Sequence, residues 1–217
     1  MSHHAHSAHI LILDDHVIIR RGLRNLITLN LPHVTVRDVS TIKDLLSYLE
    51  EHPLPHILVL DLQLADGNAM EHLEAMLASY PTLRILVYSM NPERIYAQRV
   101  VSMGCAGYLS KEAPESEVLN AIQKVMDGGT YLSLAIQMQH LDHPTASDAS
   151  PFDRLSKQEL LVLDHVLAGL GVKDIGLRMG ISMSTAATYK ARLFEKLDVV
   201  NALELQTLVN VHGYRRS

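Results

Sequence analysis

The sequence has little of the chemistry that an oxidising compartment or a lipid bilayer would require. Its 217 residues include one cysteine, Cys105, so an internal disulfide framework is excluded. No apolar run approaches the roughly 20 residues that a membrane-spanning helix needs, and the start of the chain lacks the basic-then-apolar pattern of a secretory signal. These absences predict a cytoplasmic protein that does not contact a membrane.

The chain also lacks an overall positive charge, since its formal net charge is −5 at pH 7. The charge is unevenly distributed. From Ser150 onward nine Lys or Arg stand against seven Asp or Glu, whereas the preceding residues hold ten against seventeen. Only the C-terminal part can therefore attract phosphates. The length suits two domains, because a domain typically has about 100–200 residues.

Two features that suggest metal or redox chemistry each have a plainer interpretation. His3, His4, His6 and His9 could ligate zinc, copper or nickel, or they could belong to a loose chain end, since no Cys or carboxylate joins them. Cys105 could be a redox sensor. The absence of a neighbouring basic or resolving residue favours a small buried side chain instead.

Short runs rich in Ile, Leu and Val alternate with helical patterns through the first part of the chain. Several of these runs are almost continuously apolar, which indicates strands that are covered on both faces in a parallel sheet. The pattern predicts a doubly wound α/β fold. We expect strands at 10–13, 35–39, 57–60, 84–88 and 107–109, and helices at 17–29, 41–51, 69–79, 93–103 and 115–127.

Polar residues follow the predicted strands at the edge where such a sheet binds its ligand. Asp14 and Asp15 follow the first strand, Asp61 the third, Ser89 the fourth, and Lys111 comes just after the fifth. Three carboxylates that lie close together repel one another unless a cation compensates them. A hard divalent cation is implied, and Mg²⁺ suits carboxylate oxygens and commonly bridges to a phosphoryl group.

This set of residues favours phosphoryl chemistry. An aspartate can itself be the nucleophile that accepts a phosphoryl group, and Asp61 is the candidate. Lys111 and Ser89 would then bind the new phosphoryl oxygens. A phosphate-hydrolysing enzyme on the same sheet is an alternative. It is disfavoured because Gln63 stands where an acid/base Asp would be needed, and because it leaves the second domain unexplained.

The segments ILILDDH, LVLDLQLADGNAM, ILVYSM and GYLSKEA resemble the receiver domains of bacterial two-component systems, over residues 8–129. The resemblance implies a flavodoxin-like five-stranded parallel sheet, Mg²⁺ held by Asp14 or Asp15 with Asp61, and phosphorylation of Asp61 by a sensor histidine kinase. It also implies a salt link from Lys111 and a switch at Ser89 and Tyr108, although a partly buried tyrosine is often only packing. The family usually has Met-Pro where this chain has Leu64 and Ala65, so this loop lacks the fixed backbone angle that proline provides.

Residues 130–150 contain the segment HLDHPTASDAS and show no strand or helix pattern, so they predict a flexible linker. Ordered structure should resume in a domain spanning 151–217. There Ser156 and Glu159 form a capping-box pattern at the start of a helix. We expect four helices, at 157–168, 172–179, 183–197 and 202–211.

The second and third of these helices, joined by MGIS, are typical of a helix-turn-helix. In the third helix Ala186, Tyr189, Leu193 and Leu197 form one stripe that should face the core. The other side should meet DNA, with small hydroxyl and basic side chains near bases and phosphates. The candidate DNA-binding residues are Lys173, Thr185, Thr188, Lys190, Arg192 and Lys196.

The segment LSKQELLVLDHVLAGLGVKDIGLRMGISMSTAATYKARLFEKLDVVNALEL resembles the LuxR-type helix-turn-helix of NarL/FixJ regulators. The resemblance implies an all-α four-helix domain whose third helix reads DNA and whose last helix helps to pair two copies. That family often has Val-Lys at the positions of Ala186 and Ala187. The side chains of Ala187 and Ala191 cannot hydrogen-bond a base, although their methyl groups could contact thymine.

The leading interpretation is a transcriptional response regulator, not an enzyme. Phosphorylation of Asp61 would control homodimerisation and binding to double-stranded promoter DNA, with RNA polymerase as a further candidate partner. The alternative is a phosphorylation-independent regulator or protein-docking module with a degenerate DNA-binding domain, which Ala187 and Ala191 keep open.

Overall fold

The computed structural model describes residues 8–142 and 150–214 of the chain. They fall into two compact units, which divide between Gln139 and His140. Each unit is described by itself. None of the described helices is both long enough and apolar enough to cross a membrane.

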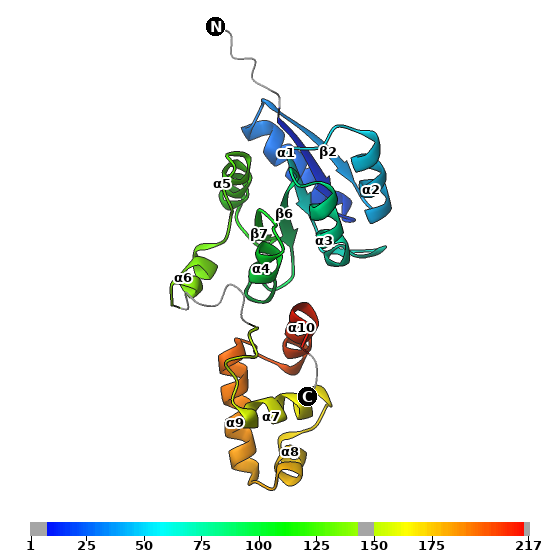
Figure 1. The fold of residues 1–217 in the computed structure, drawn as a ribbon. Coiled ribbons are helices and arrows are strands. Elements are labelled where there is room, and N and C mark those ends of the chain that lie inside the picture. The colour runs from blue at the N-terminus through cyan, green and yellow to red at the C-terminus, as the bar shows by residue number, and fades with distance from the viewer. Residues whose placement is uncertain (1–7, 143–149, 215–217) are drawn as a thin grey trace. The chain divides into compact units, whose positions relative to one another are not determined.

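The first unit contains a five-stranded sheet in which every pair of neighbouring strands is parallel (Figure 1). The strand order is β2-β1-β3-β6-β7, so the chain winds outward in both directions from β1 and β3. The predicted doubly wound sheet is confirmed, and the ends of the expected strands differ by at most two residues. The strands are β1 (Ala8–Leu13), β2 (Val34–Val39), β3 (Ile57–Leu60), β6 (Arg84–Ser89) and β7 (Gly107–Ser110).

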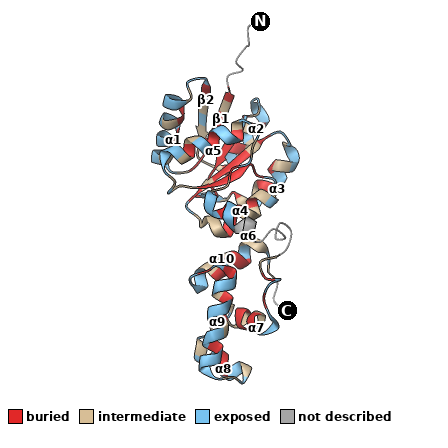
Figure 2. Cartoon of the chain, turned by 90° about the vertical axis from the view of Figure 1, so that its left-hand side faces the viewer, coloured by how far each residue is buried: buried red, intermediate tan, exposed pale blue. Residues whose placement is uncertain are grey.

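Helices cover both faces of the sheet (Figure 1). On one face α1 (Val17–Asn30) and α5 (Glu115–Met126) pack together, while α2 (Ile42–Glu51), α3 (Met70–Ser79) and α4 (Glu93–Ser102) cover the other. Successive strand residues point to opposite faces, and both faces are buried here, which explains why the central strands are almost continuously apolar. Figure 2 shows this buried sheet in red between exposed helix surfaces.

The loop after Asp61 is fixed without the Met-Pro pair that the family usually has there. A short antiparallel pair, β4 (Gln63–Leu64) and β5 (Gly67–Asn68), closes the loop. The Asp66 carboxylate accepts the backbone N–H of Ile42 at 2.8 Å and thereby ties the loop to the start of α2. These hydrogen bonds therefore restrain the loop after Asp61, as proline does in the sequence that is usual for the family.

The expectation of an unstructured segment at 130–150 was wrong in its first half. Residues Leu134–Asp142 form a helix, α6. The Ser133 hydroxyl accepts the Ile136 N–H at 3.4 Å, and the carboxylate of Glu93, in α4, accepts the Ser133 N–H at 3.3 Å. The start of α6 thus depends on a residue forty positions earlier, a contact that a local sequence pattern does not show.

The second unit contains four helices, as predicted, with ends within one residue of expectation. They are α7 (Lys157–Leu167), α8 (Val172–Met179), α9 (Met183–Leu197) and α10 (Ala202–His212). α9 packs against both α7 and α8. Between α8 and α9 the chain turns at Gly180, whose φ of 66° lies in the left-handed region that glycine adopts without strain.

The predicted apolar stripe of α9 is confirmed at three of its four positions. Ala186, Leu193 and Leu197 are buried, with exposed fractions of 3% or less. Tyr189 is only half-buried. Tyr189 therefore lies at the margin of the core of this unit. The prediction that it faces the core as fully as the other three residues was wrong.

The capping box that opens α7 is confirmed and is extended by a distant lysine. The Ser156 N–H and hydroxyl both donate to Glu159 Oε2, at 2.7 and 2.8 Å, and Ser156 Oγ accepts the Glu159 N–H. The ammonium of Lys196, in α9, donates to the same oxygen at 2.8 Å. Burial would raise the pKa of Glu159, but the hydrogen bonds from Lys196 and Ser156 lower it below its ordinary value.

We predict that Glu159→Gln lowers the free energy of unfolding of the C-terminal domain by about 1–2 kcal/mol at neutral pH, because the buried charge-assisted hydrogen bonds weaken. A carboxyl group whose pKa is lowered on folding stabilises the fold above its unfolded pKa, and that stabilisation is lost as pH falls through the folded pKa. The difference between the two proteins should therefore shrink as pH falls below about 4.3, the ordinary pKa of a glutamate, and vanish only once pH lies below the lowered pKa of Glu159 in the folded protein. Calorimetry of the full chain measures it.

The matched control is Glu195→Gln, because Glu195 lies on α9 and is exposed. It should leave the unfolding transition within about 0.5 kcal/mol of the wild type at every pH. Equal losses from the two substitutions would show that net charge, and not the capping box, sets the effect.

Candidate functional site

The carboxyl ends of the parallel strands meet at one edge of the sheet, and backbone hydrogen bonds hold them in line. The Asp61 N–H donates to the Leu13 carbonyl at 2.9 Å, which joins the ends of β3 and β1. The Lys111 N–H donates to the Ser89 carbonyl at 2.9 Å, which joins the ends of β7 and β6. The functional side chains therefore begin from a rigid frame.

A buried lysine joins two of the carboxylates. The ammonium of Lys111 lies 2.6 Å from Asp14 Oδ2 and 2.5 Å from Asp61 Oδ2. All three side chains are at most 4% exposed. Burial by itself would lower the pKa of Lys111, but hydrogen bonds to Asp14 and Asp61 raise it above its ordinary value. Lys111 is therefore a fixed cation, and it offsets part of the negative charge of this site.

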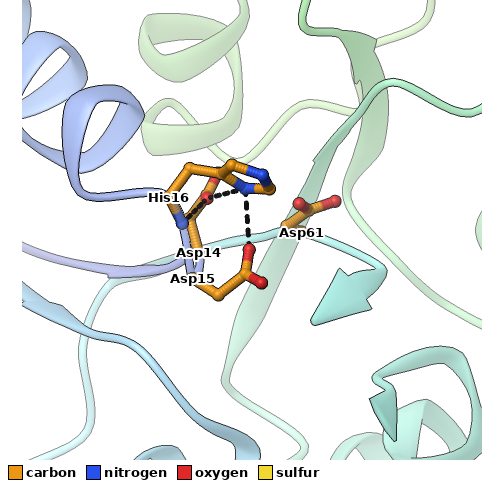
Figure 3. Close-up of side chains that lie close together, drawn as sticks. All are labelled: Asp14, Asp15, His16 and Asp61. Carbon is orange, nitrogen blue, oxygen red and sulfur yellow. Dashed lines mark hydrogen bonds and ion pairs between the residues drawn. The ribbon is translucent and has the colours of Figure 1, made fainter. Parts of the chain in front are cut away.

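Asp15 and His16 complete a group of potential metal ligands. Ligand atoms of Asp14, Asp15, His16 and Asp61 all lie within 4.8 Å of one another, the one such group of His, Cys, Asp or Glu among the side chains of residues 8–138 and 150–214. Figure 3 shows the His16 ring beside the two neighbouring carboxylates. Its Nδ1 lies 2.7 Å from Asp15 Oδ1 and 3.2 Å from Asp14 Oδ1.

The predicted switch residues lie next to this group. Ser89 is buried at the end of β6, and its hydroxyl oxygen accepts the Asn91 N–H at 3.4 Å. The Tyr108 hydroxyl donates to the Asn91 carbonyl at 2.6 Å, and its ring is fully buried. Burial raises the pKa of Tyr108. Both side chains thus contact one loop residue, Asn91, just before α4.

Of the other candidate metal and redox residues, His9 and Cys105 lie away from this edge. His3, His4 and His6 fall outside the described residues. His9 lies near the opposite end of β1, where its N–H donates to His56 Nδ1 at 3.0 Å. Cys105 is buried, and burial raises the pKa of its thiol to about 12, which favours packing over redox sensing.

Five of the six candidate DNA-binding residues are on α9, and the sixth is on α8. Thr185, Thr188 and Arg192 are exposed on that helix, and Lys173 is exposed at the start of α8. Lys190 is half-buried, with its ammonium 5.3 Å from the centre of the Phe194 ring. Lys196 is bound to Glu159, as described above. The structure therefore gives Lys196 a partner in its own domain.

Sequence reasoning missed three contributors to these sites: His16 beside the carboxylates, Asn91 between the two switch residues, and Glu159 as the partner of Lys196. The position of His16, directly after two aspartates, is a signal that could have found it. Asn91 acts through its backbone carbonyl and N–H, which no residue type reveals. The Glu159–Lys196 pair joins residues that are 37 positions apart.

Comparison with known proteins agrees with this geometry. Residues 10–123 match the response regulator receiver domain, and residues 153–209 match the bacterial regulatory proteins of the luxR family. The fold and the site thus define a DNA-binding transcriptional response regulator, a receiver joined to a LuxR-type helix-turn-helix. The chain belongs to the NarL/FixJ family of two-component response regulators.

Whole-length relatives support this assignment. The chain is 32% identical over 197 residues to BvgA of Bordetella pertussis, a putative positive transcription regulator of virulence factors, covering 90% of this chain and 93% of BvgA. It is 30% identical over 207 residues to the response regulator GacA of Pseudomonas protegens, covering 94% and 96%. RcsB of Salmonella enterica serovar Typhimurium, bound to promoter DNA with the phosphomimetic BeF₃⁻, shares the fold, with a TM-score of 0.71 and 22% identity over 94% of this chain and 98% of RcsB.

We predict that Lys111→Met lowers the free energy of unfolding of the receiver by about 3–5 kcal/mol, because it leaves two buried carboxylates without their cation. Adding Asp61→Asn to this variant should recover part of the loss, since one of those charges is removed. Hydrogen exchange of the β3 amides in the full chain measures both effects. Unchanged protection in Lys111→Met would show that the ion pairs do not stabilise the sheet.

Proposed function

We propose that Asp61 accepts a phosphoryl group from a sensor histidine kinase and that the modification controls dimerisation and promoter binding. The observation that carries this proposal is the placement of Asp61, buried at the end of β3, against the ammonium of Lys111 and within reach of Asp14 and Asp15. A carboxylate in this position can attack phosphorus while the bond to the donor breaks, and the ammonium can bind an oxygen of the transferred group.

The donor set fits Mg²⁺. Three carboxylates supply hard oxygen ligands, and the single Lys111 charge does not balance them. Asp61 with Asp14 or Asp15 would hold the ion. When bound, Mg²⁺ would offset negative charge on the phosphoryl oxygens. Because His16 Nδ1 contacts one oxygen each of Asp14 and Asp15, its ring would have to move if those oxygens become ligands.

The signal would leave the site through Ser89 and Tyr108. If Ser89 turns its hydroxyl toward the phosphoryl group, the hydrogen bond that Asn91 donates to it is lost. The Asn91 carbonyl accepts the Tyr108 hydroxyl, so a movement of this loop reaches a buried aromatic ring. The phosphoryl group would thus bias an arrangement of the β6–α4 loop that it binds better.

The output would be DNA binding by α9 in the cytoplasm, with two copies on paired half-sites. Thr185 and Thr188 would lie near the bases. Lys173, Lys190, Arg192 and Lys196 would lie near phosphates, and Lys196 would have to share its charge with Glu159. RNA polymerase is a further proposed partner. The placement of α9 on DNA is supported by RcsB, which shares the fold of this chain and was solved bound to promoter DNA.

Treatment with acetyl phosphate and Mg²⁺ should phosphorylate the wild type and strengthen both its dimerisation and its binding to promoter fragments. Asp61→Asn should take up no phosphoryl group and should not respond. The matched control is Asp127→Asn, which removes an exposed carboxylate at the end of α5 and should behave as the wild type. Mass spectrometry of the intact chain and analytical ultracentrifugation measure the two steps. Identical dimerisation and DNA binding of wild type and Asp61→Asn in every condition would favour a phosphorylation-independent docking module.

Replacement of Lys190 and Arg192 by alanine should weaken DNA binding by about the same factor on every sequence, because phosphate contacts carry no sequence information. The slope of log K against log salt should fall by about 2, one for each lost phosphate contact. Lys157→Ala, an exposed lysine at the start of α7, is the control and should leave the slope unchanged. A double variant that keeps the full slope would remove these two residues from the interface.

A further inference from the structure

The N-terminal half of the outward face of α9 carries short side chains. Ala186, Leu193 and Leu197 face the core of the second unit. On the opposite side, at helical spacing, lie Ser184, Ala187, Thr188 and Ala191, followed one turn later by Glu195, and all five are exposed. The helix contains no Asn or Gln, the residues that form paired hydrogen bonds with adenine.

The hydroxyl groups on this face are already engaged within the helix. The Thr188 hydroxyl donates its one proton to the Ser184 carbonyl at 3.0 Å. The Ser184 hydroxyl lies 2.8 Å from Ser182 Oγ, which also contacts Thr185 Oγ1 at 2.8 Å and accepts the Thr185 N–H. Thr188 therefore has no proton left for a base, and it offers its γ-methyl group and an acceptor oxygen.

The long basic side chains of α9 lie beside this face or are held elsewhere. Lys190 is half-buried over the Phe194 ring, and Lys196 is bound to Glu159. Arg192 is exposed and borders the face. The centre of the outward face, in the half of α9 that would enter the groove first, thus presents the methyl groups of Ala187, Thr188 and Ala191.

Among the four bases, only thymine presents an apolar group in the major groove, its C5 methyl group. On the basis of the proposed function of α9, we infer that this regulator reads its operator through contacts between these three side chains and thymine methyl groups. Ala187, Thr188 and Ala191 are then specificity-determining residues for A·T pairs.

The test begins with DNA sites selected from a random library by the full-length chain, treated with phosphodonor and Mg²⁺. Each dT in the selected half-site is then replaced by dU, which removes only the methyl group. Loss of a contacted methyl should weaken binding about fourfold, as expected for one buried methyl. The same replacement outside the half-site should have no effect.

The outcomes separate this inference from the proposed function. Selection that returns no preferred sequence would contradict sequence-selective DNA binding itself. A clear preference with no sensitivity to dU at any position would leave DNA binding intact and overturn the methyl-contact inference.

The Ala187→Lys variant supplies a second test, because a lysine at this position can donate to O6 and N7 of guanine. It should select guanine at one position where the wild type selects thymine, and the dU effect at that position should disappear. Lysine is a good helix former, and Ala187 is exposed, so the fold should persist. Ala168→Lys, at the exposed end of α7, adds the same charge off α9 and should leave the selected sequence unchanged. An unchanged selection by Ala187→Lys would overturn the inference.

Discussion

The ion pairs of Lys111 with Asp14 and Asp61 are the constraint on which the receiver depends. Two carboxylates are buried at the end of the sheet, where neither would stay charged at low cost without a cation. The lysine joins the ends of β1, β3 and β7 at this edge. His16 contacts the oxygens of Asp14 and Asp15 that the lysine does not reach, so its ring would have to move for a further cation to bind them. Any new negative charge on Asp61 would therefore change the ion pairs that Lys111 makes with Asp14 and Asp61.

The residues that such a change would affect lie at the end of β6 and in the loop before α4. Asn91 receives a hydrogen bond from Tyr108 and donates one to Ser89, and α4 begins two residues later. Glu93, in the first turn of α4, accepts the N–H of Ser133 at the start of α6. Contacts therefore connect the end of β6 to the segment that leaves the receiver. Each of these hydrogen bonds contributes little by itself, and each holds the end of a helix or of a strand.

The second unit depends on a different buried charge. Glu159 closes the capping box of α7 and binds Lys196 of α9, so the helix that would carry DNA contacts is anchored to the helix that opens the domain. One consequence is a division of roles along α9. Its buried stripe packs the domain and its basic side chains would bind phosphates, while small side chains occupy the N-terminal half of the outward face.

The sequence by itself determined the order of the five sheet strands and of the helices other than α6. It also determined the five polar residues at the strand ends and the capping box at Ser156. Each of these features rests on a local period or on spacing of a few residues. Tertiary structure alone decided that Lys111 bridges Asp14 and Asp61 and that His16 contacts the carboxylates. It also decided that Glu93 holds the residue before α6 and that Tyr189 lies at the margin of the core. Those features depend on contacts between residues far apart in the chain or on the packing around one side chain, and no local pattern encodes which partner a buried charge or a helix end will find.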